Sequence, residues 1–354
     1  MLQTPPPSSA AVLARTRDAL LIGAVSIWGL SAAQGFLVPQ ALAILAFVLI
    51  TAVSDYASAR LRFPHWLADL SGVIAVLTGF LGMGYIIASQ ATNFARTVST
   101  YEIELDAAVS RFVGLIGPTA TKVLTDMITA IDFQSVALIV ADGARSFLTT
   151  FLLICLYVFF MMAERRAMSH KIVLAAASED MAREVNTALA AISISLQRYV
   201  SVKTFVSFLT GMVSYLLFRL IGIEFPETWA VITFALNFIP SIGSIIAVIF
   251  PAAFALLQFE TLGPFLFIVF GCGTIQFLIG NLMDPAMMGR SLTLSTLVVI
   301  LALTFWSAVW GIIGAFLSVP LTVCLLIIFS QIKSLRPLAI LLSKDGNLDD
   351  ERRE

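Results

Sequence analysis

The chain has 354 residues, of which 59% are hydrophobic and 12% are charged, and its mean hydropathy is +0.96. Soluble domains carry about 25% charged residues, so this composition excludes an ordinary soluble domain and indicates an integral membrane protein. The formal net charge of −1 leaves no basic excess to neutralise phosphates, which argues against nucleic acid as a partner.

Apolar segments long enough to cross a bilayer recur along the chain, each needing about 20 residues per crossing. They lie at 19–53, 66–90, 146–163, 204–221, 228–258, 262–283 and 294–332. The predicted fold is therefore an all-α membrane protein with about eight transmembrane helices, of which some are broken or re-entrant hairpins. An external helical segment and a cytoplasmic amphipathic helix complete this prediction.

Three of these runs are too long for one crossing, and we expect each to fold as a hairpin. The run 19–53 should turn near Gly35 to Pro39, and 294–332 near Gly311 to Gly314. The run 228–258 contains polar residues near its middle, and a hairpin there keeps the basic C-terminal residues on the cytoplasmic side.

Lysine and arginine in the short loops predict the orientation, because they concentrate on the cytoplasmic side. Arg15 and Arg17, Arg60 and Arg62, and Arg165, Arg166 and Lys171 mark three cytoplasmic segments. The expected organisation is a cytoplasmic tail at 1–18, transmembrane helices at 19–90, an external amphipathic helical segment at 91–145, a transmembrane helix at 146–163, a cytoplasmic amphipathic helix at 164–203, a transmembrane transport core at 204–332 and a cytoplasmic tail at 333–354.

The cytoplasmic amphipathic helix has its own start signal. Ser178 is a suitable N-cap, with Glu179 and Asp180 in the first turn. One apolar face then follows at helical spacing, namely Met181, Val185, Leu189, Ile192 and Leu196. We expect this helix to lie on the bilayer surface or under the bundle; a dedicated partner site is the alternative.

The stretch LNFIPSIGSIIAVIF, Leu236 to Phe250, interrupts an apolar run with Asn237, Pro240, Ser241, Gly243 and Ser244. Proline removes a backbone donor and clashes with the carbonyl four residues back, so a helix should break there. Broken backbone at membrane depth is tolerated only where it is buried in protein or lines a watery cavity. In transporters it commonly forms the substrate or ion site; a simple kink or interfacial loop is the alternative.

A second interruption is QFLIGNLMDPAMMGR, Gln276 to Arg290. Its spacing places amide, small and carboxylate residues on one broad side of a helix, namely Gln276, Gly280, Asn281 and Asp284. Pro285 should end that helix. An intramembrane carboxylate is costly and usually functional. Asp284 could equally be an interfacial anchor that pairs with Arg290 across the turn.

The third interruption is WSAVWGIIGAFLSVPL, Trp306 to Leu321. Gly311 and Gly314 permit close backbone approach, and Trp306 and Trp310 suit an interfacial belt. Helix packing is the favoured role here, so Trp310, Gly311, Gly314 and Pro320 are predicted to be structural.

Four motifs, taken in order, resemble the autoinducer-2 exporter (AI-2E) family of bacterial membrane transporters. They are YVSVKTFVSFLTG from Tyr199, LNFIPSIGSIIAVIFP from Leu236, IGNLMDPAMMGRSLTLSTLVVILAL from Ile279 and WGIIGAFLSVPLTV from Trp310. The N-terminal half is similar only in its layout of paired helices, a third helix and an external helical segment.

This resemblance implies a multispanning transporter of the bacterial cytoplasmic (inner) membrane that uses no ATP and assembles as a homo-oligomer, with a pentamer as one candidate. Asp284 and Ser241 depart from the family pattern, which more often has Glu and an aromatic residue there. The predicted substrate pathway comprises Asn237, Pro240, Ser241, Gly243, Ser244, Gln276, Asn281, Asp284, Pro285, Gly289 and Arg290.

Two transport functions follow from this resemblance. The first is export or facilitated movement of a small polar solute similar to autoinducer-2, and the alternative is a monovalent cation/proton antiporter that uses Asp284. An intramembrane enzyme is disfavoured because the sequence has no HExxH or GxxxxGK[ST] motif, and a scaffold would not need the polar breaks. The three cysteines lack metal-type spacing, so we expect neither a metal nor a cofactor.

Overall fold

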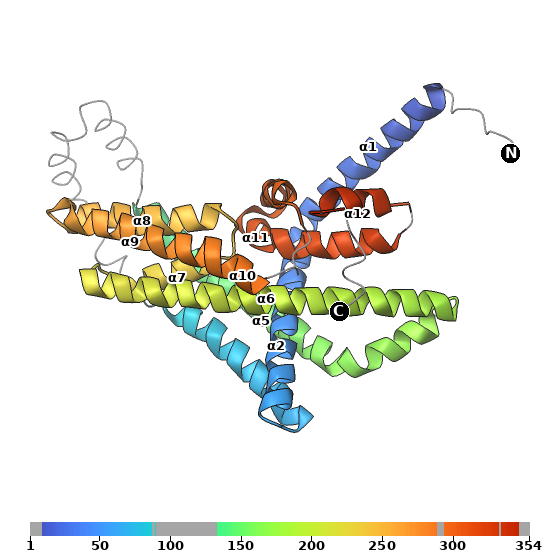
Figure 1. The fold of residues 1–354 in the computed structure, drawn as a ribbon, viewed down its shortest axis with the longest axis horizontal. Helices are drawn as coiled ribbons and strands as arrows, with labels where there is room; N and C mark the ends of the chain where they lie inside the picture. Colours follow the sequence, from blue (N-terminus) through green and yellow to red (C-terminus); the bar gives the residue numbers. More distant parts are fainter. Residues whose placement is uncertain (1–8, 87–88, 90–132, 289–293, 333, 347–354) are drawn as a thin grey trace.

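The computed structural model describes residues 9–86, 89, 133–288, 294–332 and 334–346 (Figure 1). Its helices are α1 Ser9–Ala32, α2 Gln34–Arg60, the helix His65–Ile86, α5 Phe133–Ala175, α6 Glu179–Ile221, α7 Pro226–Leu236, α8 Ile242–Gln258, α9 Leu262–Leu278, the π-helix η1 Ile279–Met283, α10 Asp284–Met288, α11 Thr296–Gln331 and α12 Arg336–Leu342. Six helices in these residues are long and apolar enough to cross a membrane, and two shorter ones are also apolar. The predicted all-α membrane fold is confirmed.

Helix α6 is the central element of the protein. It packs against α7, α9 and α10 in one half and against α11 in the other, and Figure 1 shows α2 crossing it. The hydroxyl of Ser178 caps its first turn by accepting from the N–H of Met181, and Gly222 ends it in the left-handed conformation. At about 1.5 Å per residue α6 is roughly 65 Å long, more than twice the thickness of the hydrocarbon core.

The helix predicted to begin after Ser178 is present, but it is not a separate element that ends at residue 203. Residues 164–175 continue α5, and residues 179–203 are the first part of α6. The chain has neither proline nor glycine between Ser178 and Gly211, so nothing interrupts the helix where the two predicted segments meet.

The run 228–258 is a hairpin, as expected, formed by α7 and α8. The chain reverses over 237–241, and the rings of Trp229 near the start of α7 and Phe254 near the end of α8 lie 5.5 Å apart. A Cβ atom at Gly243 would overlap the carbonyl oxygen of Leu236. The turn can therefore be this tight only because residue 243 has no side chain.

The run 294–332 is also a hairpin, because α11 folds back on itself at Trp310 and Gly311. Gly311 has a φ of 62°, which is strained for any residue with a side chain. The indole N–H of Trp306 donates to the Thr322 hydroxyl across the two arms at 3.3 Å. At Gly314 a Cβ atom would overlap the carbonyl oxygen of Trp306.

The turns of the two hairpins pack against each other. The Phe238 ring, from the turn between α7 and α8, stacks on the Phe316 ring of α11 with centroids 4.8 Å apart. Ile239 packs with Leu303 and Ala315 in a small buried cluster at the same place. The two turns therefore share a buried contact, while Ser241 and Gly311 at the breaks are exposed.

The expected hairpin within 19–53 is wrong. The chain breaks at Ala33, while Gly35 and Pro39 lie inside α2. Figure 1 shows α1 leading into α2 at an open angle rather than folding back along it. Pro39 removes a single hydrogen bond close to the start of α2, so the helix continues through it.

Several other expectations concern residues that the structure does not describe, or describes only in part. Residues 91–132 of the predicted external segment lie outside the described residues, and its last part belongs to α5. Residues 1–8 of the N-terminal tail and 347–354 of the C-terminal tail are also outside them, whereas residues 9–18 belong to α1.

Substituting Gly314 by Ala tests the tight crossing in α11. The added methyl group must push the two arms apart, and overpacking of this kind costs about 1–3 kcal/mol. We expect a lower thermal unfolding midpoint for the detergent-solubilised variant. Gly79→Ala is the control, because its added Cβ meets nothing within 4 Å and alanine favours a helix. Equal thermal unfolding midpoints for Gly314→Ala and Gly79→Ala would contradict the close approach of the two arms of α11 at Gly314.

Candidate functional site

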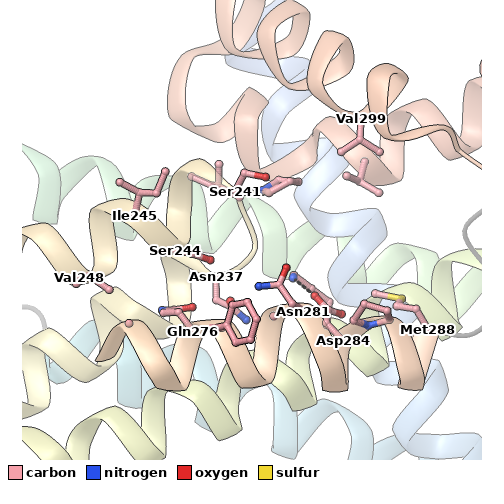
Figure 2. A pocket seen from close by; sticks show the side chains of 18 of the residues that line it. Asn237, Ser241, Ser244, Ile245, Val248, Gln276, Asn281, Asp284, Met288 and Val299 are labelled. Carbon is pink, nitrogen blue, oxygen red and sulfur yellow. Dashed lines mark hydrogen bonds and ion pairs between the residues drawn. The ribbon is translucent and has the colours of Figure 1, made fainter. Parts of the chain in front are cut away.

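A cavity of about 820 Å³ lies between α6, the α7–α8 hairpin, the continuous stretch α9–η1–α10 and α11 (Figure 2). The four motifs singled out in the sequence all contribute to its wall. Its lining residues are Tyr199, Lys203, Asn237, Ile239, Pro240, Ser241, Ser244, Ile245, Val248, Ile249, Gly273, Gln276, Phe277, Gly280, Asn281, Asp284, Pro285, Met288, Val299 and Val319.

A buried ion pair closes one end of the cavity. The ammonium group of Lys203 on α6 lies 2.6 Å from Oδ2 of Asp284 on α10, and the two side chains are only 10% and 17% exposed. The second carboxylate oxygen, Oδ1, is buried and has no hydrogen-bond partner among the protein atoms. The two charges of the pair cancel, yet Oδ1 of Asp284 is still free to accept a hydrogen bond.

Gln276 of α9 is the second polar feature of the wall. Its side chain is buried, the residue being only 8% exposed, and neither its amide nitrogen nor its amide oxygen has a protein partner. Buried polar atoms without partners are costly, by about 1–3 kcal/mol each. An amide held this way beside a cavity can donate to and accept from a polar solute.

The π-helix η1 brings Gln276 and Asp284 towards the same side. In a regular α-helix, eight residues at about 100° each would leave the two side chains about 80° apart around the axis. The wider i→i+5 turn reduces the rotation per residue. The N–H of Asp284 indeed donates to the carbonyl of Ile279, five residues earlier, and Figure 2 shows Gln276 and Asp284 along one edge of the cavity.

The turn of the α7–α8 hairpin forms the opposite wall. Ser241 has a φ of 58° and a ψ of −53°, and the N–H of Ile242 donates to the carbonyl of Pro240 at 2.6 Å, which describes a strained γ-turn. The Asn237 amide donates to the Ser207 hydroxyl of α6 at 3.0 Å, and both residues are buried. This hydrogen bond fixes the strained turn against α6.

The structure brings most of the predicted pathway residues together. Asn237, Pro240, Ser241, Ser244, Gln276, Asn281, Asp284 and Pro285 line the cavity. Gly243 is packed in the turn instead of lining the cavity. Pro285 does not end the helix, which continues to Met288, because the backbone has already left the regular i→i+4 pattern in η1 just before it. Gly289 and Arg290 lie outside the described residues, so their predicted roles stay predictions.

The residues predicted to be structural lie away from the cavity wall. Trp310 is buried and donates its indole N–H to the carbonyl of Leu30 at 3.0 Å, and Trp306 is buried beside it. Neither indole lies exposed as an interfacial belt residue would. Gly311 and Gly314 form the turn of α11, and Pro320 is buried in its second arm.

Sequence reasoning did not single out Lys203 and Tyr199. Both belong to the motif YVSVKTFVSFLTG, and they lie four residues apart on the face of α6 that lines the cavity. The predicted cytoplasmic segment 164–203 ends at Lys203, a place where a lysine needs no partner. A lysine between apolar residues on a helix that continues unbroken is the signal that could have indicated the ion pair.

The described residues contain no group of histidine, cysteine, aspartate or glutamate side chains that could hold a metal ion. The chemistry that the cavity offers is hydrogen bonding, through one carboxylate oxygen, one ammonium group and several amides and hydroxyls. It therefore suits recognition of a polar solute.

The model for the family described as "AI-2E family transporter" matches residues 19–334. A putative transport protein of Haemophilus influenzae is 32% identical over 334 residues, which covers 91% of this chain and 93% of the relative. The AI-2 transport protein TqsA of Escherichia coli is 30% identical over 340 residues, with coverages of 90% and 92%. The putative transport protein YhhT of Escherichia coli is 28% identical over 352 residues, with coverages of 96% and 97%.

Lys203→Met tests the buried ion pair, because it leaves the Asp284 carboxylate buried without its partner. We expect a loss of about 3–5 kcal/mol of folding stability, measured as a lower unfolding midpoint in detergent. The double variant Lys203→Met, Asp284→Asn should recover much of this loss because no charge remains unpaired.

The control for this experiment is Lys171→Met, since Lys171 forms an exposed ion pair with Glu164. Exposed pairs contribute about 0–1 kcal/mol, so the midpoint of this variant should barely change. If the losses of folding stability caused by the Lys203 and Asp284 substitutions simply added in the double variant, the two residues would not be an interacting pair.

Proposed function

Because the chain belongs to the AI-2E transporter family, we propose that it exports a small polar solute of the autoinducer-2 type across the bacterial cytoplasmic membrane through the cavity of Figure 2. Transport without ATP hydrolysis is part of this proposal and agrees with the absence of a GxxxxGK[ST] motif from the sequence. The main support is the set of unpartnered polar atoms on Gln276 and Asp284, which face a cavity built from broken helices.

The polar atoms in the cavity favour this function over cation/proton antiport. Asp284 is the carboxylate that an antiporter would use, but its Oδ2 already binds the ammonium group of Lys203 at 2.6 Å. A monovalent cation would have to compete with a fixed positive charge for that oxygen. A neutral solute can donate a hydrogen bond to Oδ1 and leave the pair intact.

The placement in the membrane is part of the same proposal. Both termini lie in the cytoplasm and the segment 91–145 lies outside, an arrangement supported by the lysines and arginines of the short loops. The protein works as a homo-oligomer, which the family resemblance supports.

Gln276→Leu separates transport from folding. The side chain makes no hydrogen bond within the protein, so its loss should leave the unfolding midpoint unchanged or raised. Solute flux in liposomes that contain the purified protein should fall by about tenfold, because hydrogen bonds to the solute are worth about 0.5–1.5 kcal/mol each.

The control is the same substitution at Gln258, which lies outside the cavity and bonds to the Glu224 N–H and the Gly222 carbonyl. Gln258→Leu should lower the midpoint and leave flux per folded molecule unchanged. Unchanged flux in Gln276→Leu would contradict the proposed site. A sodium gradient imposed on the same liposomes tests the alternative function, cation/proton antiport. Sodium-driven proton movement by the wild type that is lost in Asp284→Asn would contradict the proposed export and support antiport.

Single cysteines test the orientation in a background without Cys155, Cys272 and Cys324. We place them at Ser110 in the expected external segment, and at the exposed positions Ala177 and Lys344. An impermeant thiol reagent applied to intact cells should label the variant at position 110 alone. After the cells are opened all three should react, and labelling at 177 in intact cells would reverse the orientation.

A further inference from the structure

The mouth of the cavity between α8 and α9 is apolar. Ile245 and Ile249 of α8 and Phe277 of α9 line the cavity and are 58%, 57% and 60% exposed. Phe277 belongs to a candidate membrane span and α8 is itself an apolar helix, so exposed apolar side chains at this edge suit contact with lipid. The other exposed residues of the lining are Ser241, Asn281 and Pro285, so the cavity is apolar at its edge between α8 and α9 and more polar elsewhere.

The interior of the cavity combines a short polar row with apolar walls. Figure 2 shows Val248 and Val299 at opposite ends, with Gln276 of α9, Asn281 of η1 and Asp284 of α10 between them. The unpartnered atoms of Gln276 and Asp284 suit a neutral head group that both donates and accepts hydrogen bonds, such as a diol.

The size of the cavity exceeds what a small polar head group needs. Sites for drug-sized ligands have volumes of about 300–1,000 Å³ and mainly apolar walls with a few polar groups. At about 820 Å³ this cavity lies in the upper part of that range. The remaining space, between the polar row and the apolar mouth, suits an alkyl chain.

We propose that the cavity also takes neutral amphiphiles that carry a diol head group and a linear alkyl chain, and that these enter sideways from the bilayer between α8 and α9. The head group binds at Gln276 and Asp284, and the chain lies against Ile245, Ile249 and Phe277. This inference rests on the proposed function, because it assigns the transport cavity a second class of solute.

The test uses linear vicinal alkanediols from butanediol to decanediol with the full-length protein in lipid nanodiscs. Calorimetric titration, corrected with protein-free nanodiscs of the same lipid, gives the affinity of each diol for the protein. Since each buried methylene contributes about 0.8 kcal/mol, we expect the affinity to rise about fourfold per methylene until the chain fills the mouth.

Ile249→Trp should remove most of this chain-length dependence, because the larger ring narrows the mouth. Phe250→Trp is the matched control: Phe250 is its neighbour on α8, equally exposed at 57%, and does not line the cavity. This variant should bind the whole series as the wild type does. The proposal would be overturned if the affinity of the wild type for the diols did not rise with chain length. It would also be overturned if the affinities of Ile249→Trp and Phe250→Trp rose equally with chain length.

The liposome flux assay separates this proposal from the proposed function. Polar-solute flux that is inhibited equally by short and long diols refutes sideways entry and leaves the exporter intact. Diol affinity that rises with chain length in a protein without polar-solute flux refutes the exporter and leaves the amphiphile site intact. A disulfide between Ile249→Cys residues of two copies would show the mouth covered by a second protomer, which would overturn entry from lipid.

Discussion

The ion pair between Lys203 and Asp284 is the interaction on which the site depends most. A buried charge without its partner costs several kcal/mol, so α6 and α10 can pack only in the register that joins these two groups. One turn further along α6, Ser207 then meets Asn237 and holds the turn of the α7–α8 hairpin. Two polar contacts on one face of α6 thus position both walls of the cavity.

The broken helices beside these walls are joined by a buried contact between their turns. The turns of α7–α8 and α11 pack through Phe238 and Phe316, while Ser241, which lines the cavity, and Gly311 are themselves exposed. Gly243 and Gly314 let each turn close within van der Waals contact of its own carbonyls. The strained backbone at Ser241 is held by this packing and directed at the cavity.

The sequence predicts the breaks well and their consequences less well. Proline and glycine act locally, so the turns at 237–244 and 311–314 and the cavity residues Gln276 and Asp284 could be found without a structure. The π-helix has no such local signal in the sequence, so its wider turns were not predicted. The partner of Asp284 could not be identified either, since Lys203 lies 81 residues away on a helix that the sequence analysis divided at that residue.

The charge balance of the cavity finally restricts what it can hold at low cost. An anion bound to Lys203 would compete with Asp284, and a cation bound to Asp284 would compete with Lys203. In either case the displaced partner is left buried and unpaired, which costs about 3–5 kcal/mol. A neutral hydroxyl group can instead donate to Oδ1 of Asp284, which is buried and unpartnered, without breaking the pair. The same two residues that hold the helices together therefore favour neutral, hydroxyl-bearing solutes over ions.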